Sequence, residues 1–141
     1  MKILIIEDDA IVAVMQKMWI TKVCQCEAEV FSNGQEALEF LDIDCDENPE
    51  EDYFIFLDIN MPVMNGWNFL QVCEKRSYVS RISVVVVTSS RFVEDYRRAK
   101  QSPLVVDFQN KPMDASSILR YFGKRKKGEP QGRMFPEVNL N

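Results

Sequence analysis

Histidine is absent from the 141 residues of this chain. Its absence excludes catalysis by a serine–histidine or cysteine–histidine pair, and it excludes a phosphoryl carrier that uses a histidine of its own. The cysteines form no CxxC pair, so their spacing does not indicate a structural zinc site. We expect reduced, partly buried thiols. The four cysteines are Cys24, Cys26, Cys45 and Cys73.

The sequence also lacks a long apolar stretch and an excess of basic residues. Only four apolar residues follow Lys2 before the acids begin at Glu7, which is too few for a signal peptide or a membrane span. The net charge of -5 disfavours nucleic acid as a partner. We predict a cytoplasmic, soluble protein without membrane insertion. Since 46% of the residues are hydrophobic, one domain with a substantial core is expected.

Short apolar runs alternate with segments of helical periodicity along the chain. The runs predict five strands, over 2–6, 27–31, 53–58, 83–87 and 104–108. The periodic segments predict helices over 10–23, around 37–41, over 67–75, over 91–100 and from 114 onward. This alternation is typical of an α/β fold with a doubly wound parallel sheet, right-handed crossovers and helices on both faces.

Several local features accompany these elements. The methionines of the first helix, including Met15 and Met18, are interpreted as core residues, and Trp19 and Trp67 as partly buried packing residues. Asp9 and Asp114 are predicted to cap the first and last helices. Asn33-Gly34 is predicted to form a turn, and residues 42–52 a solvated acidic loop.

Asp58 follows the apolar run Tyr53–Leu57 directly. A strand buried on both faces would place this carboxylate at its carboxyl end, where open α/β sheets bind their ligands. There it can act as a nucleophile. A strand-capping aspartate in a turn is the simpler alternative for this residue taken alone.

Other strand ends carry matching groups. Glu7, Asp8 and Asp9 follow the first strand, Thr88 follows the fourth, and Lys111 follows the last. Because the ends of parallel strands lie along one edge, we expect these groups to meet Asp58. Clustered carboxylates repel unless a cation lies among them, and hard oxygen ligands favour Mg²⁺. The set predicts a phosphoryl-transfer site in which Asp58 is the acceptor.

The four segments ILIIEDD, FLDINMPVMNG, VVVVTSS and FQNKP resemble, in order and spacing, the receiver domain of two-component response regulators. The resemblance covers residues 1–122 and leaves 123–141 as a C-terminal extension. It implies a flavodoxin-like sheet of five strands in the order 2-1-3-4-5, which makes the first and third strands neighbours. We expect a stand-alone, single-domain response regulator.

The same resemblance implies the metal site. Asp58 corresponds to the phosphorylated aspartate and Asp8 to the direct Mg²⁺ ligand. Glu7 corresponds to the acid that holds a metal-bound water. The backbone carbonyl of Asn60 is the remaining ligand that it implies.

It also implies the residues of the conformational switch. Thr88 corresponds to the hydroxyl that moves onto the phosphoryl group, supported by Ser89. Lys111 pairs with that group and precedes Pro112 through a cis peptide bond. Phe108 occupies the aromatic switch position, where many relatives have tyrosine.

The expected partners are a histidine kinase or a histidine phosphotransfer protein as donor, and an unknown output partner. We do not expect an enzyme beyond self-catalysed phosphotransfer and autodephosphorylation. One alternative is a small phosphatase of the haloacid-dehalogenase type, which requires a second aspartate where this chain has Asn60. Another alternative is a pseudo-receiver that works without phosphorylation.

Overall fold

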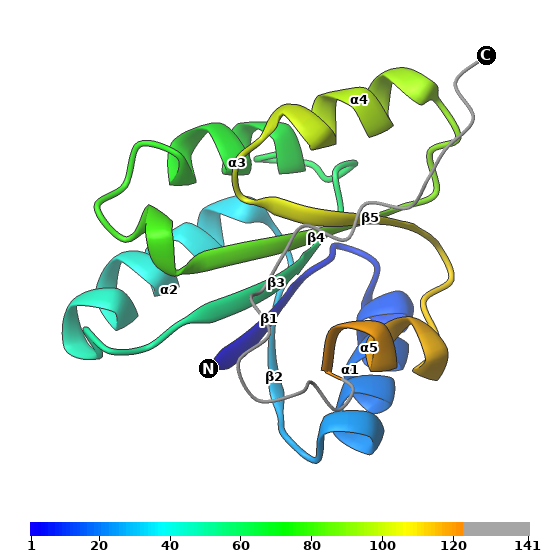
Figure 1. Cartoon of the computed structure of the whole chain (residues 1–141), viewed down its shortest axis with the longest axis horizontal. Coiled ribbons are helices and arrows are strands. Elements are labelled where there is room, and N and C mark those ends of the chain that lie inside the picture. The colour runs from blue at the N-terminus through cyan, green and yellow to red at the C-terminus, as the bar shows by residue number, and fades with distance from the viewer. Residues whose placement is uncertain (123–141) are drawn as a thin grey trace.

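A computed structural model describes residues 1–122, and the predicted extension 123–141 lies outside the described residues. Five strands form one parallel sheet in the order β2-β1-β3-β4-β5 (Figure 1). The strands are β1 (Lys2–Ile6), β2 (Ala28–Phe31), β3 (Tyr53–Leu57), β4 (Ile82–Thr88) and β5 (Val105–Asn110). The predicted fold class and strand order are therefore confirmed.

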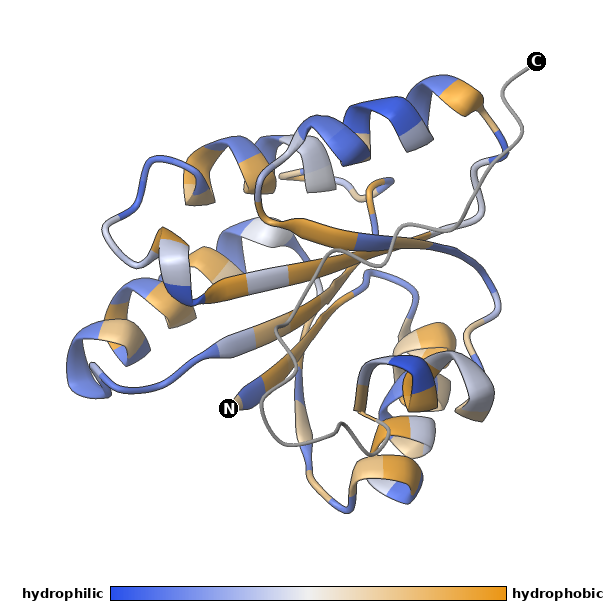
Figure 2. Ribbon diagram, in the orientation of Figure 1, coloured by the Kyte–Doolittle hydropathy of each residue, from blue (hydrophilic) through white to orange (hydrophobic). Residues whose placement is uncertain are grey.

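Five α-helices and one short 3₁₀ helix connect the strands. They are α1 (Ala10–Cys24), α2 (Gly34–Glu47), α3 (Gly66–Cys73), η1 (Val79–Arg81), α4 (Val93–Gln101) and α5 (Ala115–Phe122). Helices α1 and α5 cover one face of the sheet, and α2, α3 and α4 cover the other (Figure 1). The apolar strands lie between these layers (Figure 2), which explains why β1, β3 and β4 are almost continuously hydrophobic.

Helix α2 differs from the prediction at both ends. It starts at Gly34 and is capped by the Asn33 side chain, so the predicted turn at these residues is wrong. It then continues to Glu47, so the acidic segment is a loop only after that residue. The helix continues because Asp44 points inward, where its carboxylate accepts hydrogen bonds from Lys2 Nζ at 2.8 Å and from the Tyr53 hydroxyl at 2.5 Å.

Helix α1 has the predicted extent but turns its larger apolar residues outward. Met15 is 46% exposed and Met18 is 55% exposed, so their interpretation as core residues is wrong. The buried residues of α1 are Ala13, Gln16 and Ile20. Helical spacing shows that residues share a face, but it does not decide which face packs on the sheet.

The predicted helix caps and the predicted partial burial of the two tryptophans are confirmed. The Asp9 side chain accepts from the N–H groups of the first turn of α1, and Asp114 accepts from Ser117 N–H at 3.1 Å. Trp19 and Trp67 are half-buried. Phe92, which precedes α4, and Leu119 of α5 are large apolar residues that are exposed.

The cysteines are unpaired, as expected from the sequence. All four cysteines are free thiols, and Cys45 and Cys73 are buried. Within residues 1–122, none of the helices is both long and apolar enough to cross a membrane.

Candidate functional site

The register of the central strands brings the predicted acids together. Ile6 of β1 pairs with Leu57 of β3, so Glu7 and Asp58 are the next residues of two neighbouring strands. The Asp58 N–H continues the ladder by donating to the Ile6 carbonyl at 3.0 Å. Carboxylate oxygens of Glu7, Asp8 and Asp58 all lie within 4.8 Å of one another. The predicted acidic cluster therefore forms at the carboxyl edge of the sheet.

Two of these three acids are buried. Glu7 is 3% exposed and Asp58 is 4% exposed, whereas Asp8 is open to solvent. Burial raises the pKa of Glu7, and the nearby Asp58 charge raises it further. Burial likewise raises the pKa of Asp58, with a contribution from Asp8, although Lys111 and the Asn60 N–H act in the opposite direction. The cluster therefore concentrates negative charge that a cation would relieve.

Lys111 supplies part of that positive charge. Its Nζ lies 2.8 Å from Glu7 Oε2 and 3.6 Å from Asp58 Oδ2. Burial by itself lowers the pKa of Lys111, but the two carboxylates outweigh this effect and leave it raised. Glu7 Oε2 is buried without a well-aligned hydrogen-bond donor among residues 1–122, so its contact with Lys111 is an ion pair. One lysine thus faces two buried carboxylates.

The loop after Asp58 is held in an unusual backbone conformation. Asn60 N–H donates to Asp58 Oδ1 at 3.2 Å, which orients the carboxylate. Val63 has a φ of 70°, rare for a β-branched residue, and Met64 N–H donates across it to the Pro62 carbonyl at 2.9 Å. The loop therefore turns tightly beside the acidic cluster.

Gly66 closes this loop against the strand end. A Cβ at Gly66 would lie 2.7 Å from the Asp58 carbonyl oxygen and 2.7 Å from Ile59 Cα. Only glycine permits such a close approach of two backbone segments. The position of Asp58 therefore depends on the start of α3 as well as on β3.

Thr88, the last residue of β4, is completely buried. Its hydroxyl oxygen accepts from the Ser90 N–H at 3.0 Å, and its carbonyl accepts from the Lys111 N–H at 2.9 Å. Ser89 is exposed. The β4–α4 loop is also tied to β5, because Asn110 Nδ2 donates to the Ser90 carbonyl at 2.7 Å.

Phe108 points away from α5 and packs against α4. It is 8% exposed, and its ring centroid lies 5.6 Å from that of Tyr96 in an edge-to-face arrangement. The peptide bond between Lys111 and Pro112 is cis, as the resemblance implied.

Sequence reasoning missed one buried polar residue beside this set. Asp107 precedes Phe108 and is completely buried. An acid inside the otherwise apolar run Val105–Phe108 was the feature that would have indicated it.

The residues at this edge fit a magnesium ion. Glu7, Asp8 and Asp58 offer hard carboxylate oxygens, and exposed Asp8 leaves the cluster accessible from solvent. Magnesium prefers such oxygen ligands and retains waters alongside them. The raised pKa values of Glu7 and Asp58 provide a physical reason for a divalent cation here.

A doubly wound sheet with an acidic cluster, a buried threonine and a lysine at its carboxyl edge is typical of an α/β domain that binds its ligand at that edge. The family profile "Response regulator receiver domain" matches residues 3–122. The chain belongs to this family, the receiver domains of two-component systems.

Solved structures agree with this assignment. A two-component response regulator from Legionella pneumophila is 26% identical, with a TM-score of 0.71, covering 86% of this chain and 94% of that one. A two-component response regulator from Cytophaga hutchinsonii is 24% identical, with a TM-score of 0.77 and coverages of 86% and 92%. The chemotaxis protein CheY4 from Vibrio cholerae is 21% identical, with a TM-score of 0.69 and coverages of 86% and 94%. A search of curated protein sequences found no match to the chain.

Proposed function

We propose that Asp58 accepts a phosphoryl group from a phosphohistidine on a kinase or phosphotransfer protein. A carboxylate oxygen of Asp58 attacks phosphorus, the phosphorus–nitrogen bond of the donor breaks, and a mixed anhydride forms on Asp58. The observation that supports this proposal best is the position of Asp58. It lies at the end of the central strand, within 4.8 Å of two acids and 3.6 Å from Lys111 Nζ.

The surrounding residues would each contribute to that transfer. Lys111 neutralises charge on the phosphoryl oxygens, and the Asn60 N–H fixes one Asp58 oxygen so that the other faces the donor. Glu7, Asp8, Asp58 and the Asn60 carbonyl would hold Mg²⁺, which supplies electrostatic stabilisation of the phosphoryl group when bound. The Thr88 hydroxyl, which accepts a hydrogen bond from the Ser90 N–H, would leave this partner and donate to the transferred phosphoryl group.

We further propose that the phosphoryl group controls binding of an output partner, and that the domain is not an enzyme acting on a separate substrate. Asn60 supports this view, because the haloacid-dehalogenase mechanism needs an acid at that position. The complete set of acids, Thr88 and Lys111 supports phosphorylation over a pseudo-receiver role.

The test is phosphorylation by acetyl phosphate, followed by intact-mass measurement. Wild-type protein with Mg²⁺ should gain one phosphoryl group, and Asp58→Asn should gain none. Asp52→Asn is the matched control, because Asp52 is an exposed acid at the opposite end of β3. Equal labelling of wild type and Asp58→Asn would contradict the assignment of Asp58.

A further inference from the structure

Asp107 is a buried acid within the apolar first part of the edge strand β5. None of its surface is exposed, although a buried carboxylate is unfavourable unless it is paired. Its neighbour Phe108 lies on the opposite face of β5, against Tyr96 of α4. Asp107 is therefore adjacent in the chain to the predicted switch aromatic, but its carboxylate lies on the opposite face of the strand.

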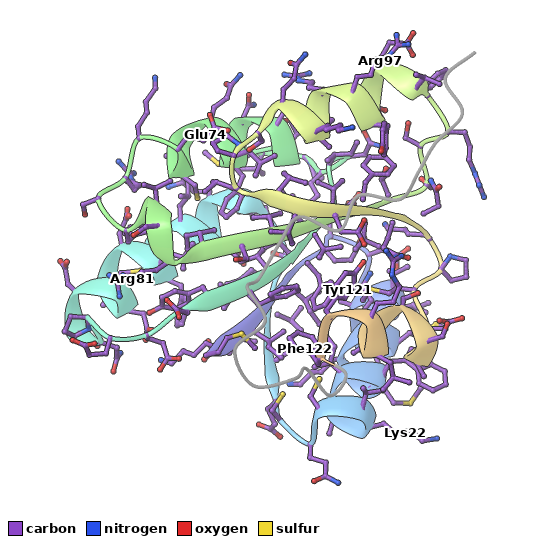
Figure 3. All side chains as sticks on the ribbon, viewed as in Figure 1. Lys22, Glu74, Arg81, Arg97, Tyr121 and Phe122 are labelled. Carbon is purple, nitrogen blue, oxygen red and sulfur yellow. The ribbon has the colours of Figure 1, made fainter. Side chains whose placement is uncertain are left out.

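Those contacts join β5 to α5. Asp107 Oδ2 accepts a hydrogen bond from the Tyr121 hydroxyl at 2.6 Å, and it lies 3.4 Å from Arg120 Nη2. Asp107 Oδ1 accepts from the Phe108 backbone N–H at 2.8 Å. One carboxylate thus connects the backbone of the switch residue to two side chains of the last helix. One of the two, Tyr121, is labelled in Figure 3.

The position of Phe108 in the sheet explains why its N–H group needs this acceptor. β5 is the outermost strand, and the Lys111 N–H donates to β4 at the Thr88 carbonyl. Alternation along the strand turns the N–H of Asp107 toward β4 as well, and that of Phe108 toward the free edge. The register is also irregular just before Asp107, where Val106 is an extra residue. The Asp107 side chain therefore replaces a missing ladder partner.

Tyr121 is held in place independently of Asp107. Its ring centroid lies 5.7 Å from that of Phe54 and 5.9 Å from that of Phe56, both on β3. Because the aromatic packing fixes the ring, the hydroxyl is presented to Asp107 from a rigid position. Movement of α5 along the sheet would accordingly move this hydroxyl relative to the carboxylate.

We propose that Asp107 is a positioning residue that fixes the β5 backbone at Phe108, and that its hydrogen bond to Tyr121 couples the orientation of Phe108 to α5. The functional importance of this coupling rests on the proposed role of Phe108 as a switch. The coupling itself concerns two hydrogen bonds and exists whether or not Asp58 is phosphorylated. By reciprocity, a change at α5 must then alter the environment of Phe108.

Tyr121→Phe tests the coupling, because it keeps the ring and removes only the hydroxyl. Tyr78→Phe is the matched control, since the buried Tyr78 also donates its hydroxyl to a carboxylate, that of Asp42 at 2.7 Å. The readouts are the aromatic NMR signals of Phe108 and hydrogen exchange of its amide. A purely structural role for the Tyr121 hydroxyl would lower stability, as Tyr78→Phe is expected to do, without changing these signals.

We expect Tyr121→Phe to shift the Phe108 signals and speed exchange of its amide, and Tyr78→Phe to leave both as in wild type. Asp107→Ala should shift the Phe108 signals at least as far, and adding Tyr121→Phe to it should cause no further shift. Unchanged Phe108 signals in Tyr121→Phe would overturn the proposal. This variant decides the question alone if Asp107→Ala does not fold.

Intact mass after treatment with acetyl phosphate separates this result from the proposed function. Tyr121→Phe should accept one phosphoryl group as wild type does, because Tyr121 belongs to neither the acidic cluster nor its ion pairs with Lys111. If wild-type protein accepts none, the proposed function fails, whereas the NMR comparison of Tyr121→Phe with Tyr78→Phe still supports or overturns the coupling.

Discussion

Lys111 lies closer to Glu7 than to Asp58, at 2.8 Å from the first carboxylate and 3.6 Å from the second. The lysine therefore neutralises mainly the acid that is not the expected phosphoacceptor. This arrangement leaves one Asp58 oxygen bound by the Asn60 N–H and the carboxylate only partly paired. A partly paired nucleophile beside an available ammonium group is suited to accept a negatively charged phosphoryl group.

Removing Lys111 should destabilise the protein in a pH-dependent manner. Lys111→Ala leaves the buried Glu7 and Asp58 without their cation, so we expect a loss of about 1–3 kcal/mol at neutral pH without Mg²⁺. Burial already raises both carboxyl pKa values, and the substitution raises them further. Carboxyl groups with raised pKa values take up protons more readily in the folded state than in the unfolded state. The loss of stability caused by Lys111→Ala should therefore become smaller as the pH falls toward the ordinary carboxyl range.

Urea unfolding at pH 7.5 and pH 5 measures this effect. Lys75→Ala is the control, because Lys75 is exposed and its removal should change stability by less than about 0.5 kcal/mol. A loss in Lys111→Ala that is equal at both pH values would contradict the ion-pair explanation. With Mg²⁺ present, Lys111→Ala should still accept a phosphoryl group but should bind the output partner poorly.

Magnesium should stabilise the domain through the acidic cluster. At ten times its dissociation constant, a ligand that binds only the folded state adds about 1.4 kcal/mol of stability. Asp8→Asn should lose most of this gain, because it removes an exposed carboxylate of the cluster. Thermal unfolding with increasing Mg²⁺, in the absence of a phosphoryl donor, measures the gain.

The neighbouring residue provides the control for this experiment. Asp9 caps α1 through hydrogen bonds to the N–H groups of Ile11 and Val12. Asp9→Asn should therefore keep the full response to Mg²⁺. An identical response of Asp8→Asn and Asp9→Asn would show that the cluster is not the binding site.

Gly66→Ala should disturb Asp58 without touching its side chain. The new Cβ would lie 2.7 Å from the Asp58 carbonyl oxygen, so the backbone must move, and we expect a cost of about 1–3 kcal/mol and slower phosphorylation. Gly34→Ala is the control, because its Cβ would come no closer than 3.0 Å to Met64 Cγ and 3.2 Å to the Met64 carbonyl oxygen, so a smaller adjustment is needed. Comparable losses of phosphorylation rate in both variants would argue against backbone positioning of Asp58.

The sequence was sufficient to predict the sheet and most of its carboxyl edge, because strand runs and the residues after them are local features. Glu7, Asp58 and Thr88 could be placed together once parallel order was assumed. The face of α1 that packs on the sheet could not be predicted, since Met15 and Ile20 are both apolar. Only packing against the sheet decides that Ile20 is the buried residue. The length of α2 was not predicted because the polar residue Asp44 indicates a loop in the sequence. Its burial is explained only by the contact with Lys2 in the structure.

The hydrogen bond and ion pair of Asp107 with α5 could not be predicted from the sequence. Its partners Arg120 and Tyr121 come from another element, and a carboxylate in an edge strand is compatible with solvent exposure. Lys111 could be assigned to the site from its motif, but its preference for Glu7 over Asp58 depends on differences of less than 1 Å in side-chain placement.

Phe108 should remain largely buried even without activation. It is 8% exposed and packed against Tyr96, and its backbone is held by Asp107. A phenylalanine has no hydroxyl to leave unpaired in an apolar site, so burial costs it less than it would cost a tyrosine. We therefore predict measurable affinity for the output partner before phosphorylation.

NMR with the phosphate mimic beryllofluoride can measure how far the ring at position 108 is already buried before activation, in wild type and in Phe108→Tyr. The wild-type ring signals of Phe108 should change little when beryllofluoride binds, because the ring is already inside. Phe108→Tyr should favour an exposed ring in the free protein, since its hydroxyl prefers water to the apolar contact with Tyr96, and its signals should change more. Signals around Ser89 should respond in both proteins, which confirms that the mimic has bound near Thr88. If the wild-type ring shifts as far as that of Phe108→Tyr, Phe108 is not held inward before activation.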